Sequence, residues 1–163
     1  MKRGRQKVVE LPELKEILSG ARMKKWTIVF TNGCFDLVHI GHLRYLEEAR
    51  SLGDMLVVGL NSDDSVRMLK GNTRPIMTQI ERAELLGGLA CVDYVIVFSE
   101  LRPDSLLAEV RPDIHVKGGD YRLEDLPEAT VVRSYGGKIA LLPFTQGFST
   151  SAIINRIRCE RNK

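Results

Sequence analysis

The chain has 163 residues, of which 44% are hydrophobic and 28% charged, and its formal net charge is +3. This length and apolar content suit one soluble α/β domain, and three cysteines without a CxxC spacing exclude a disulfide framework or a zinc site as the basis of the fold. No apolar run approaches the roughly 18–20 residues of a membrane span, and the N-terminus lacks the apolar segment of a signal peptide. We therefore expect a cytoplasmic protein with no membrane partner.

The net positive charge of the chain is concentrated in the first 25 residues. Eight Lys or Arg stand there against three Glu, a local charge of +5 that leaves −2 for the rest of the chain. The basic residues have no interleaved aromatic residues and the remaining chain is not basic, so we interpret this segment as a solvated extension and expect no nucleic-acid partner. A helical apolar spacing within it predicts a short helix packed on the domain, through Leu11, Leu14, Ile17, Leu18 and Ala21. We divide the chain into this extension, residues 1–25, and a domain, residues 26–163.

A predicted buried strand over residues 27–30 leads into the most informative stretch of the chain. Gly33 stands at the exit of that strand, and a helix with Leu43, Leu46 and Ala49 on one face begins soon after it. A glycine allows the backbone to approach a phosphate closely, and a helix start offers unpaired N–H groups and the positive end of the helix dipole. The sequence predicts an anion-binding site here.

His39 and His42 lie three residues apart at this helix start, with Gly41 between them. At that spacing both rings project from one helix face, and an imidazole can donate a hydrogen bond to charge that develops on a phosphoryl group. Two of the three histidines of the chain lie on this one turn, which favours a functional pair over two unrelated structural histidines.

Polar and basic residues follow the second predicted strand, residues 55–60. Asn61 and Asp63 are candidates for binding an acceptor molecule, or are ordinary turn and cap residues. Residues 70–77 predict a mobile basic loop beside the site, where Lys70 could reach a phosphate. A capping box over residues 78–81 opens the next helix, and Arg82 in its first turn has either an anionic ligand or a neighbouring glutamate as its partner.

The second half of the chain continues the alternation of strands and helices. We expect strands over residues 92–98, 114–117 and 138–142, with helices over residues 103–110 and 126–135 between them. The fourth strand ends in two glycines and Asp120, which suits contacts with a ribose or a base. Ser149 and Thr150 open the last helix, and this second helix start could hold a triphosphate from the side opposite the first.

The predicted fold is a doubly wound, five-stranded parallel sheet of the α/β class, with its ligand at the switch point beyond the first strand. The pattern Gly33-x-Phe35-Asp36-x-x-His39-x-Gly41-His42 resembles the signature of the cytidylyltransferase-like branch of the nucleotidyltransferase superfamily, whose members have a Rossmann-like fold and an HxGH motif. The string His-Ile-Gly-His also occurs in class I aminoacyl-tRNA synthetases, which are much longer chains.

Further segments narrow this resemblance to the heptose-1-phosphate adenylyltransferases of lipopolysaccharide core synthesis. They are Thr31-Asn32-Gly33, Asn61-Ser62-Asp63, Lys70-Gly71 with Arg74-Pro75, residues 116–121, and Gly147-x-Ser149-Thr150. The resemblance implies transfer of AMP from ATP to D-glycero-β-D-manno-heptose 1-phosphate, giving ADP-heptose and pyrophosphate, with Mg²⁺ accompanying ATP. It also implies a stand-alone enzyme supplied by a separate heptose kinase. The oligomeric state stays open, a homo-oligomer included.

The resemblance carries three sets of site residues onto this sequence, and no side chain is assigned as a metal ligand. The expected catalytic residues are His39, His42, Lys70, Ser149 and Thr150. The expected nucleotide-binding residues are Thr31, Asn32, Gly33, Cys34, Phe35, Gly41, Lys117, Gly118 and Asp120. The expected acceptor-binding residues are Asp36, Asn61, Asp63, Arg74 and Arg82, where Asp36 either orients the turn or helps to hold the metal.

Two departures from the family pattern bear on the choice of nucleotide. Phe144 stands where related cytidylyltransferases usually have an arginine, which favours ATP over CTP, and Ser151 replaces a threonine while keeping its hydroxyl. The alternatives are a cytidylyltransferase acting on glycerol 3-phosphate or a phosphoamine, a flavin nucleotide synthase, and a non-catalytic nucleotide- or RNA-binding module. The intact histidine pair argues against the last of these.

Overall fold

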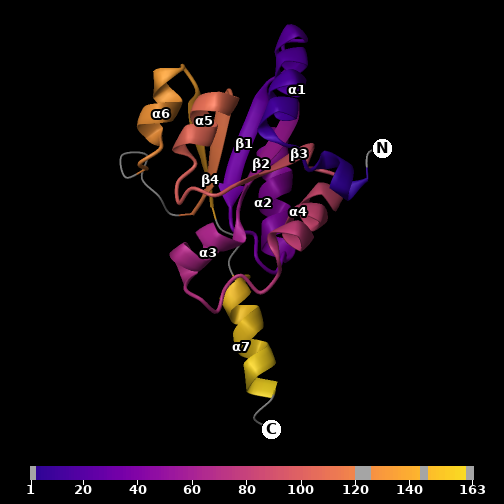
Figure 1. The fold of residues 1–163 in the computed structure, drawn as a ribbon, viewed down its shortest axis with the longest axis vertical. Coiled ribbons are helices and arrows are strands. Elements are labelled where there is room, and N and C mark those ends of the chain that lie inside the picture. The colour runs from indigo at the N-terminus through magenta and orange to yellow at the C-terminus, as the bar shows by residue number, and fades with distance from the viewer. Residues whose placement is uncertain (1–2, 120–125, 144–146, 161–163) are drawn as a thin grey trace.

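The computed structural model describes residues 3–119, 126–143 and 147–160 (Figure 1). The chain forms alternating strands and helices over most of this length. In chain order the elements are η1 (Gly4–Lys7), α1 (Leu11–Met23), β1 (Ile28–Gly33), α2 (Ile40–Ser51), β2 (Met55–Asn61), α3 (Asp63–Lys70), α4 (Gln79–Gly88), β3 (Tyr94–Phe98), α5 (Asp104–Val110), β4 (Ile114–Gly118), α6 (Ala129–Ser134), β5 (Lys138–Leu142) and α7 (Thr150–Glu160).

The five strands form one parallel sheet in the order β3-β2-β1-β4-β5. The strand β1 is central, with Ile28 opposite Met55 of β2 and Val29 opposite Ile114 of β4. The chain winds outward from β1 in one direction through β2 and β3, and in the other through β4 and β5. The predicted doubly wound sheet is therefore confirmed, and its switch point lies between the carboxyl ends of β1 and β4.

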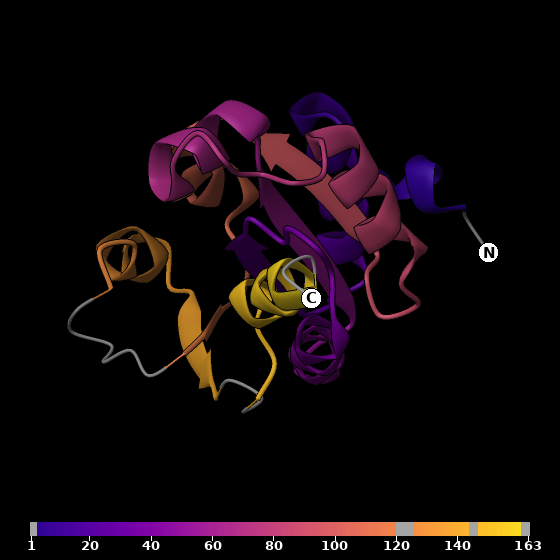
Figure 2. The same ribbon diagram turned by 90° about the horizontal axis from the view of Figure 1, so that it is seen from below.

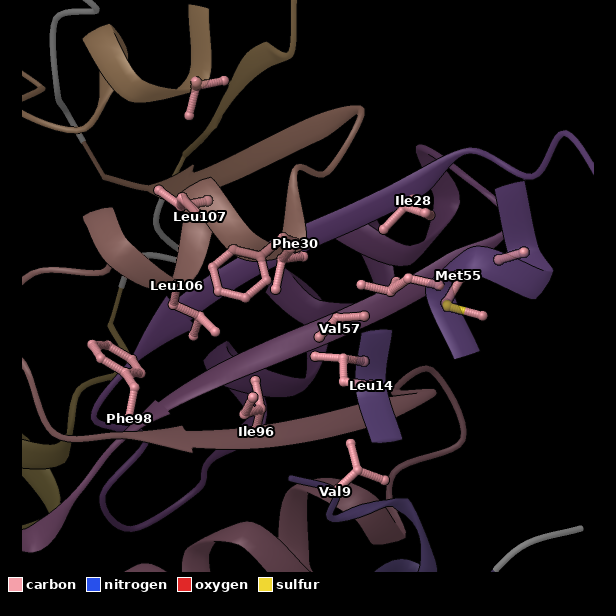
Figure 3. Packing of buried hydrophobic residues seen from close by; sticks show 14 residues of the cluster. Val9, Leu14, Ile28, Phe30, Met55, Val57, Ile96, Phe98, Leu106 and Leu107 are labelled. Carbon is pink, nitrogen blue, oxygen red and sulfur yellow. The ribbon is translucent and has the colours of Figure 1, made fainter. Parts of the chain in front are cut away.

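Helices cover both faces of the sheet, which explains why its strands are near-continuous apolar runs. Alternate residues of β1 point to opposite faces, so Ile28 and Phe30 join one core and Val29 the other. The first core, shown in Figure 3, packs against α1, α5 and α6, and the second packs against α2 and α4. The two cores hold the sheet from both sides, and so they hold in place the strand ends that form the switch point.

The N-terminal segment packs on the domain more closely than a solvated extension would. Lys7, expected in solvent, donates from Nζ to the carbonyl oxygens of Leu89 (3.1 Å) and Val92 (2.6 Å). The next residues run beside β3, where the N–H of Val9 donates to the carbonyl of Val95 at 2.9 Å. The predicted helix is present as α1, and its apolar face belongs to the first core. Val9, Leu14, Leu18 and Ala21 of this segment are buried in the first core.

The helix α3 was not predicted, and neither was the short 3₁₀ helix η1. The Ser62 side chain caps α3 by accepting from the N–H of Ser65 at 3.2 Å, Asp63 and Asp64 lie in its first turn, and Gly71 ends it with φ of +91°. These are standard helix-boundary features, but the helix is only eight residues long. The predicted helix over 126–135 is also shorter, and α6 spans Ala129–Ser134.

The last helix, α7, extends downward from the domain in Figure 1, and Figure 2 views it from below.

None of the helices in the described part of the chain is both long and apolar enough to cross a membrane.

Candidate active site

A pocket of about 540 Å³ opens at the switch point, between the carboxyl ends of β1 and β4 and the starts of α2 and α7. Its lining comes from five separate parts of the chain. The lining residues are Asn32, Gly33, Cys34, Phe35, His39, Gly41, His42, Tyr45, Lys70, Gly118, Pro143, Gly147, Phe148, Ser149 and Thr150. The structure therefore brings together all five predicted catalytic residues and most of the predicted nucleotide-binding residues.

The loop from β1 to α2 is held in an unusual conformation. Phe35 and Leu37 have φ values of +44° and +52°, in the left-handed region that side chains with a Cβ rarely adopt. Asp36 between them accepts from the N–H groups of Ile76 (2.9 Å) and Met77 (3.1 Å) and from Nε of Arg74 (2.6 Å). Backbone strain of this kind persists where surrounding bonds enforce it, and here they fix the loop that carries the histidines.

The two histidines cap the start of α2 and stack on each other, with ring centroids 3.9 Å apart. The N–H of Gly41 donates to Nδ1 of His39 at 3.1 Å, and the N–H of His39 donates to Nδ1 of His42 at 3.3 Å. Because each Nδ1 accepts, each neutral ring carries its proton on Nε2. The helix cap thus fixes both tautomers and leaves two Nε2–H donors at the pocket wall.

Both rings are neutral at pH 7. Burial lowers the pKa of His39, and burial together with the neighbouring His39 lowers the pKa of His42 to about 4. A neutral imidazole still donates one hydrogen bond, and it does so without requiring protonation of the buried site.

We expect long-range ¹H–¹⁵N NMR spectra at pH 7 to show the Nε2–H tautomer for His39 and His42, with His42 remaining neutral until the pH approaches 4. Because the folded-state pKa is below the ordinary 6.5, the unfolded chain takes up the proton first. The stability that His42 contributes is therefore complete above pH 6.5 and falls as the pH drops towards 4. A His42 signal that titrated near pH 6.5 in the free protein would contradict this assignment.

The start of α7 forms another part of the pocket wall. Oγ of Ser149 accepts from the N–H of Ala152 at 3.1 Å and so caps the helix. Oγ1 of Thr150 donates to the carbonyl oxygen of Asp36 at 2.7 Å, which ties this helix to the histidine loop. Two helix starts, each with its N–H groups and positive dipole end, therefore line one pocket, as the sequence predicts for a triphosphate site.

Lys70 and Cys34 also line the pocket. Lys70 is the last residue of α3 and not part of the predicted loop. It adds a cation to the pocket wall, where none of the lining residues that the structure describes is a carboxylate. Burial raises the pKa of the Cys34 thiol, so this side chain is protonated and weakly reactive at pH 7.

The predicted acceptor-binding residues lie beneath the pocket and bind one another. Asp36 and Arg74 form an ion pair, and burial opposes ionisation of the Asp36 carboxyl, but the hydrogen bonds from Ile76, Met77 and Arg74 lower its pKa. Because Asp36 accepts from three protein donors, it orients the turn. This is one of the two roles that the sequence left open, the other being to hold the metal.

Arg82 is the clearest difference from the prediction, because its side chain is 0% exposed. Its guanidinium donates to the carbonyl oxygens of Met77 (3.1 Å), Cys34 (2.6 Å) and Asn61 (2.9 Å), and it pairs with Asp63 at 2.7 Å. These bonds use all three nitrogens of the side chain. In this arrangement Arg82 stabilises the floor of the site and does not face an acceptor.

Two predicted nucleotide-binding residues stand behind the pocket wall. Thr31 is fully buried, and its hydroxyl lies 2.6 Å from that of Tyr45, which donates to the carbonyl oxygen of Val116 at 3.1 Å. Lys117 contacts Asn32 and does not itself line the pocket. Asp120 and Phe144 lie outside the described residues.

Sequence reasoning missed Tyr45, Pro143, Gly147 and Phe148 in the pocket lining. Tyr45 had a usable signal, since it lies three residues after His42 on the same helix face. Phe148 is 47% exposed. The guanidinium carbon of Arg44 lies 5.8 Å from the centroid of the Phe148 ring. An aromatic residue in a loop gives no such periodic signal.

A second cavity, of about 630 Å³, lies at the amino ends of β1, β4 and β5. Its arginines already have protein partners, because Arg22 donates to the carbonyl oxygens of Val110 and Arg111, and Arg111 lies over the ring of Tyr135. Ligands of doubly wound sheets bind at the opposite, carboxyl edge, so we place the active site at the histidine pocket.

A parallel sheet whose switch point carries two helix starts, a histidine pair and a lysine around one pocket defines a protein of the doubly wound α/β class. The chain matches the family model described as Cytidylyltransferase-like over residues 30–156, and it belongs to that family. The predicted membership of this nucleotidyltransferase branch is confirmed.

Relatives agree with this assignment. The chain is 52% identical over 144 residues to the bifunctional protein HldE of Syntrophotalea carbinolica, and 50% identical over 154 residues to that of Geobacter sulfurreducens. These matches cover 88% and 94% of this chain but 29% and 31% of the relatives, so the chain spans less than a third of their length.

Solved structures show the same fold. A lipopolysaccharide core biosynthesis protein from Thermoplasma volcanium is 31% identical with a TM-score of 0.59, and the match covers 74% of this chain and 97% of that one. Pantothenate synthetase from Thermus thermophilus has a TM-score of 0.66 at 16% identity, over 90% of this chain and 67% of that one, a likeness of fold alone.

Proposed function

We propose that this chain is an adenylyltransferase that transfers AMP from ATP to D-glycero-β-D-manno-heptose 1-phosphate, releasing pyrophosphate and ADP-heptose. The observation that carries the proposal is the pocket itself, where two Nε2–H donors, Lys70 and two helix starts surround a space to which the described residues contribute no carboxylate. The heptose motifs of the sequence supply the acceptor, supported by the likeness to HldE proteins and to a lipopolysaccharide core biosynthesis protein.

The proposed reaction is one in-line displacement at the α-phosphorus of ATP. An oxygen of the sugar phosphate forms the new P–O bond, and the bond from the α-phosphorus to the oxygen that bridges it to the β-phosphorus breaks, so pyrophosphate leaves with that electron pair. The acceptor oxygen is already anionic, which makes a general base and a covalent enzyme intermediate unnecessary. Catalysis is then positioning and charge stabilisation by His39, His42, Lys70 and the helix-start N–H groups.

Mg²⁺ enters this proposal as part of the MgATP substrate. Among the described residues no group of three or more His, Cys, Asp or Glu side chains could hold a metal ion, and the pocket lining contains no carboxylate. Mg²⁺ commonly binds through substrate phosphates and water, and it would supply charge neutralisation on the triphosphate. We further propose that a heptose kinase reaction supplies the sugar 1-phosphate and that the reaction occurs in the cytoplasm.

The test is pyrophosphate release in magnesium buffer with ATP or CTP, each paired with the heptose 1-phosphate and with glycerol 3-phosphate. We expect release only with ATP and the heptose. The double variant His39→Asn with His42→Asn is assayed in parallel with the same substrate pairs. It gives the pyrophosphate release that does not depend on the histidine pair. Release with CTP and glycerol 3-phosphate would overturn the heptose assignment while keeping the histidine chemistry. Nucleotide binding without release in any well would indicate another acceptor or a non-catalytic module.

A further inference from the structure

A line of charged and polar side chains runs from the pocket into the interior, across β1, β4 and the start of α6. Oδ1 of Asn32, a pocket-lining residue, accepts from Nζ of Lys117 at 3.2 Å. The same Nζ lies 2.6 Å from Oε1 of Glu128, which in turn lies 3.6 Å from Nε2 of His115. Neither Glu128 nor His115 is among the site residues predicted from the sequence.

The inner end of this line is almost completely closed to solvent. The side chains of His115 and Glu128 are 0% and 4% exposed, and that of Lys117 is 18% exposed. Burial lowers the pKa of His115, which keeps the ring neutral, whereas His115 and Lys117 outweigh burial and lower the pKa of Glu128 to about 2. The Lys117 ammonium is therefore the cation that compensates the buried Glu128 carboxylate.

The position of Lys117 determines which way the Asn32 amide faces. An ammonium group has donors only, so the amide must turn its oxygen towards Lys117. Its NH₂ group then has no hydrogen-bond partner among the described residues and stands at the pocket wall. Phosphate oxygens are acceptors only, so a bound triphosphate fits this orientation and not the flipped one.

We propose that Glu128 is a positioning residue for nucleotide binding, which holds Lys117 against Asn32 and so presents the Asn32 NH₂ group to a phosphate oxygen. This inference rests on the proposed nucleotide function. Glu128 is the residue directly before α6. Through Lys117 it links the start of that helix to Asn32 at the end of β1, and it does not line the pocket itself.

The test measures ATP binding by calorimetry with Mg²⁺ and without acceptor, so that no turnover occurs. Glu128→Gln removes the charge that holds Lys117, and we expect the Kd for ATP to rise about tenfold, while kcat at saturating ATP changes less than twofold. Asn32→Ala should raise the Kd by a similar factor, and adding Glu128→Gln to it should change the Kd by less than twofold. Glu109→Gln removes the same charge from an exposed ion pair with Lys15 and serves as the matched control.

A tenfold effect of Glu128→Gln that persisted in the Asn32→Ala background would overturn the inference, because it would show that Glu128 acts through the general fold. An unchanged Kd in Glu128→Gln would overturn it as well. If Glu128→Gln does not fold, the pair Lys117→Met with Glu128→Gln leaves no unpaired buried charge, and it should show the same loss of ATP affinity. Failure of the heptose assignment would appear in the pyrophosphate assay and would leave these binding ratios unchanged.

Discussion

Replacing either His39 or His42 by asparagine is expected to lower kcat by about 10²–10³, the scale for losing one preorganised donor to a developing charge. The amide oxygen of asparagine can take the place of Nδ1 and keep the cap of α2, whereas the Nε2–H donor is lost. The change therefore removes the chemistry with little effect on the helix start. The measurement is steady-state pyrophosphate release, with thermal unfolding recorded for each variant.

Ile40→Ala is the matched control for this result. Ile40 is the first residue of the same helix, is 39% exposed and does not line the pocket, so its loss should leave kcat within about twofold. Because the two rings stack and are proposed to act on one phosphoryl group, the double asparagine variant should lose less than the product of the single losses. Turnover that survived both replacements would refute the role of the histidine pair.

Arg82→Met is expected to lower the free energy of unfolding by roughly 3–5 kcal/mol, the cost of breaking a buried ion pair by removing one partner. The change leaves three backbone carbonyls without their donor and Asp63 without its cation. Urea denaturation at pH 7 measures the effect. We expect a lower midpoint and, where the variant is folded, an unchanged KM for the acceptor.

Arg67→Met gives the comparison for this prediction. Arg67 pairs with Asp64 on the surface of α3, and exposed pairs contribute about 0–1 kcal/mol. An Arg82→Met protein with normal stability and a greatly raised acceptor KM would contradict the structural role, and would restore the ligand contact predicted from the sequence.

The chain pattern alone predicted the sheet because helices cover both of its faces, so the central strands β1 and β2 are buried over most of their length. Such strands are mostly apolar, and five short, largely apolar runs with helical segments between them leave few other folds. The capping box at Thr78 and Glu81 was equally local and is present, with the Thr78 N–H 2.8 Å from Oε2 of Glu81. The histidine loop was also predictable, because its spacing from Gly33 to His42 is contained within ten residues.

Only the tertiary structure showed which polar residues bind other protein groups and which line the pocket. Nothing in the sequence near Arg82 shows that Cys34, 48 residues earlier, offers it a carbonyl oxygen, so a ligand was an equally reasonable partner. The line from Asn32 to His115 likewise depends on the pairing of β1 with β4. Apolar periodicity and helix caps involve residues that are close in the sequence, so the sequence alone reveals them. The partner of a buried charge is close only in the folded chain, and its position depends on how the elements pack.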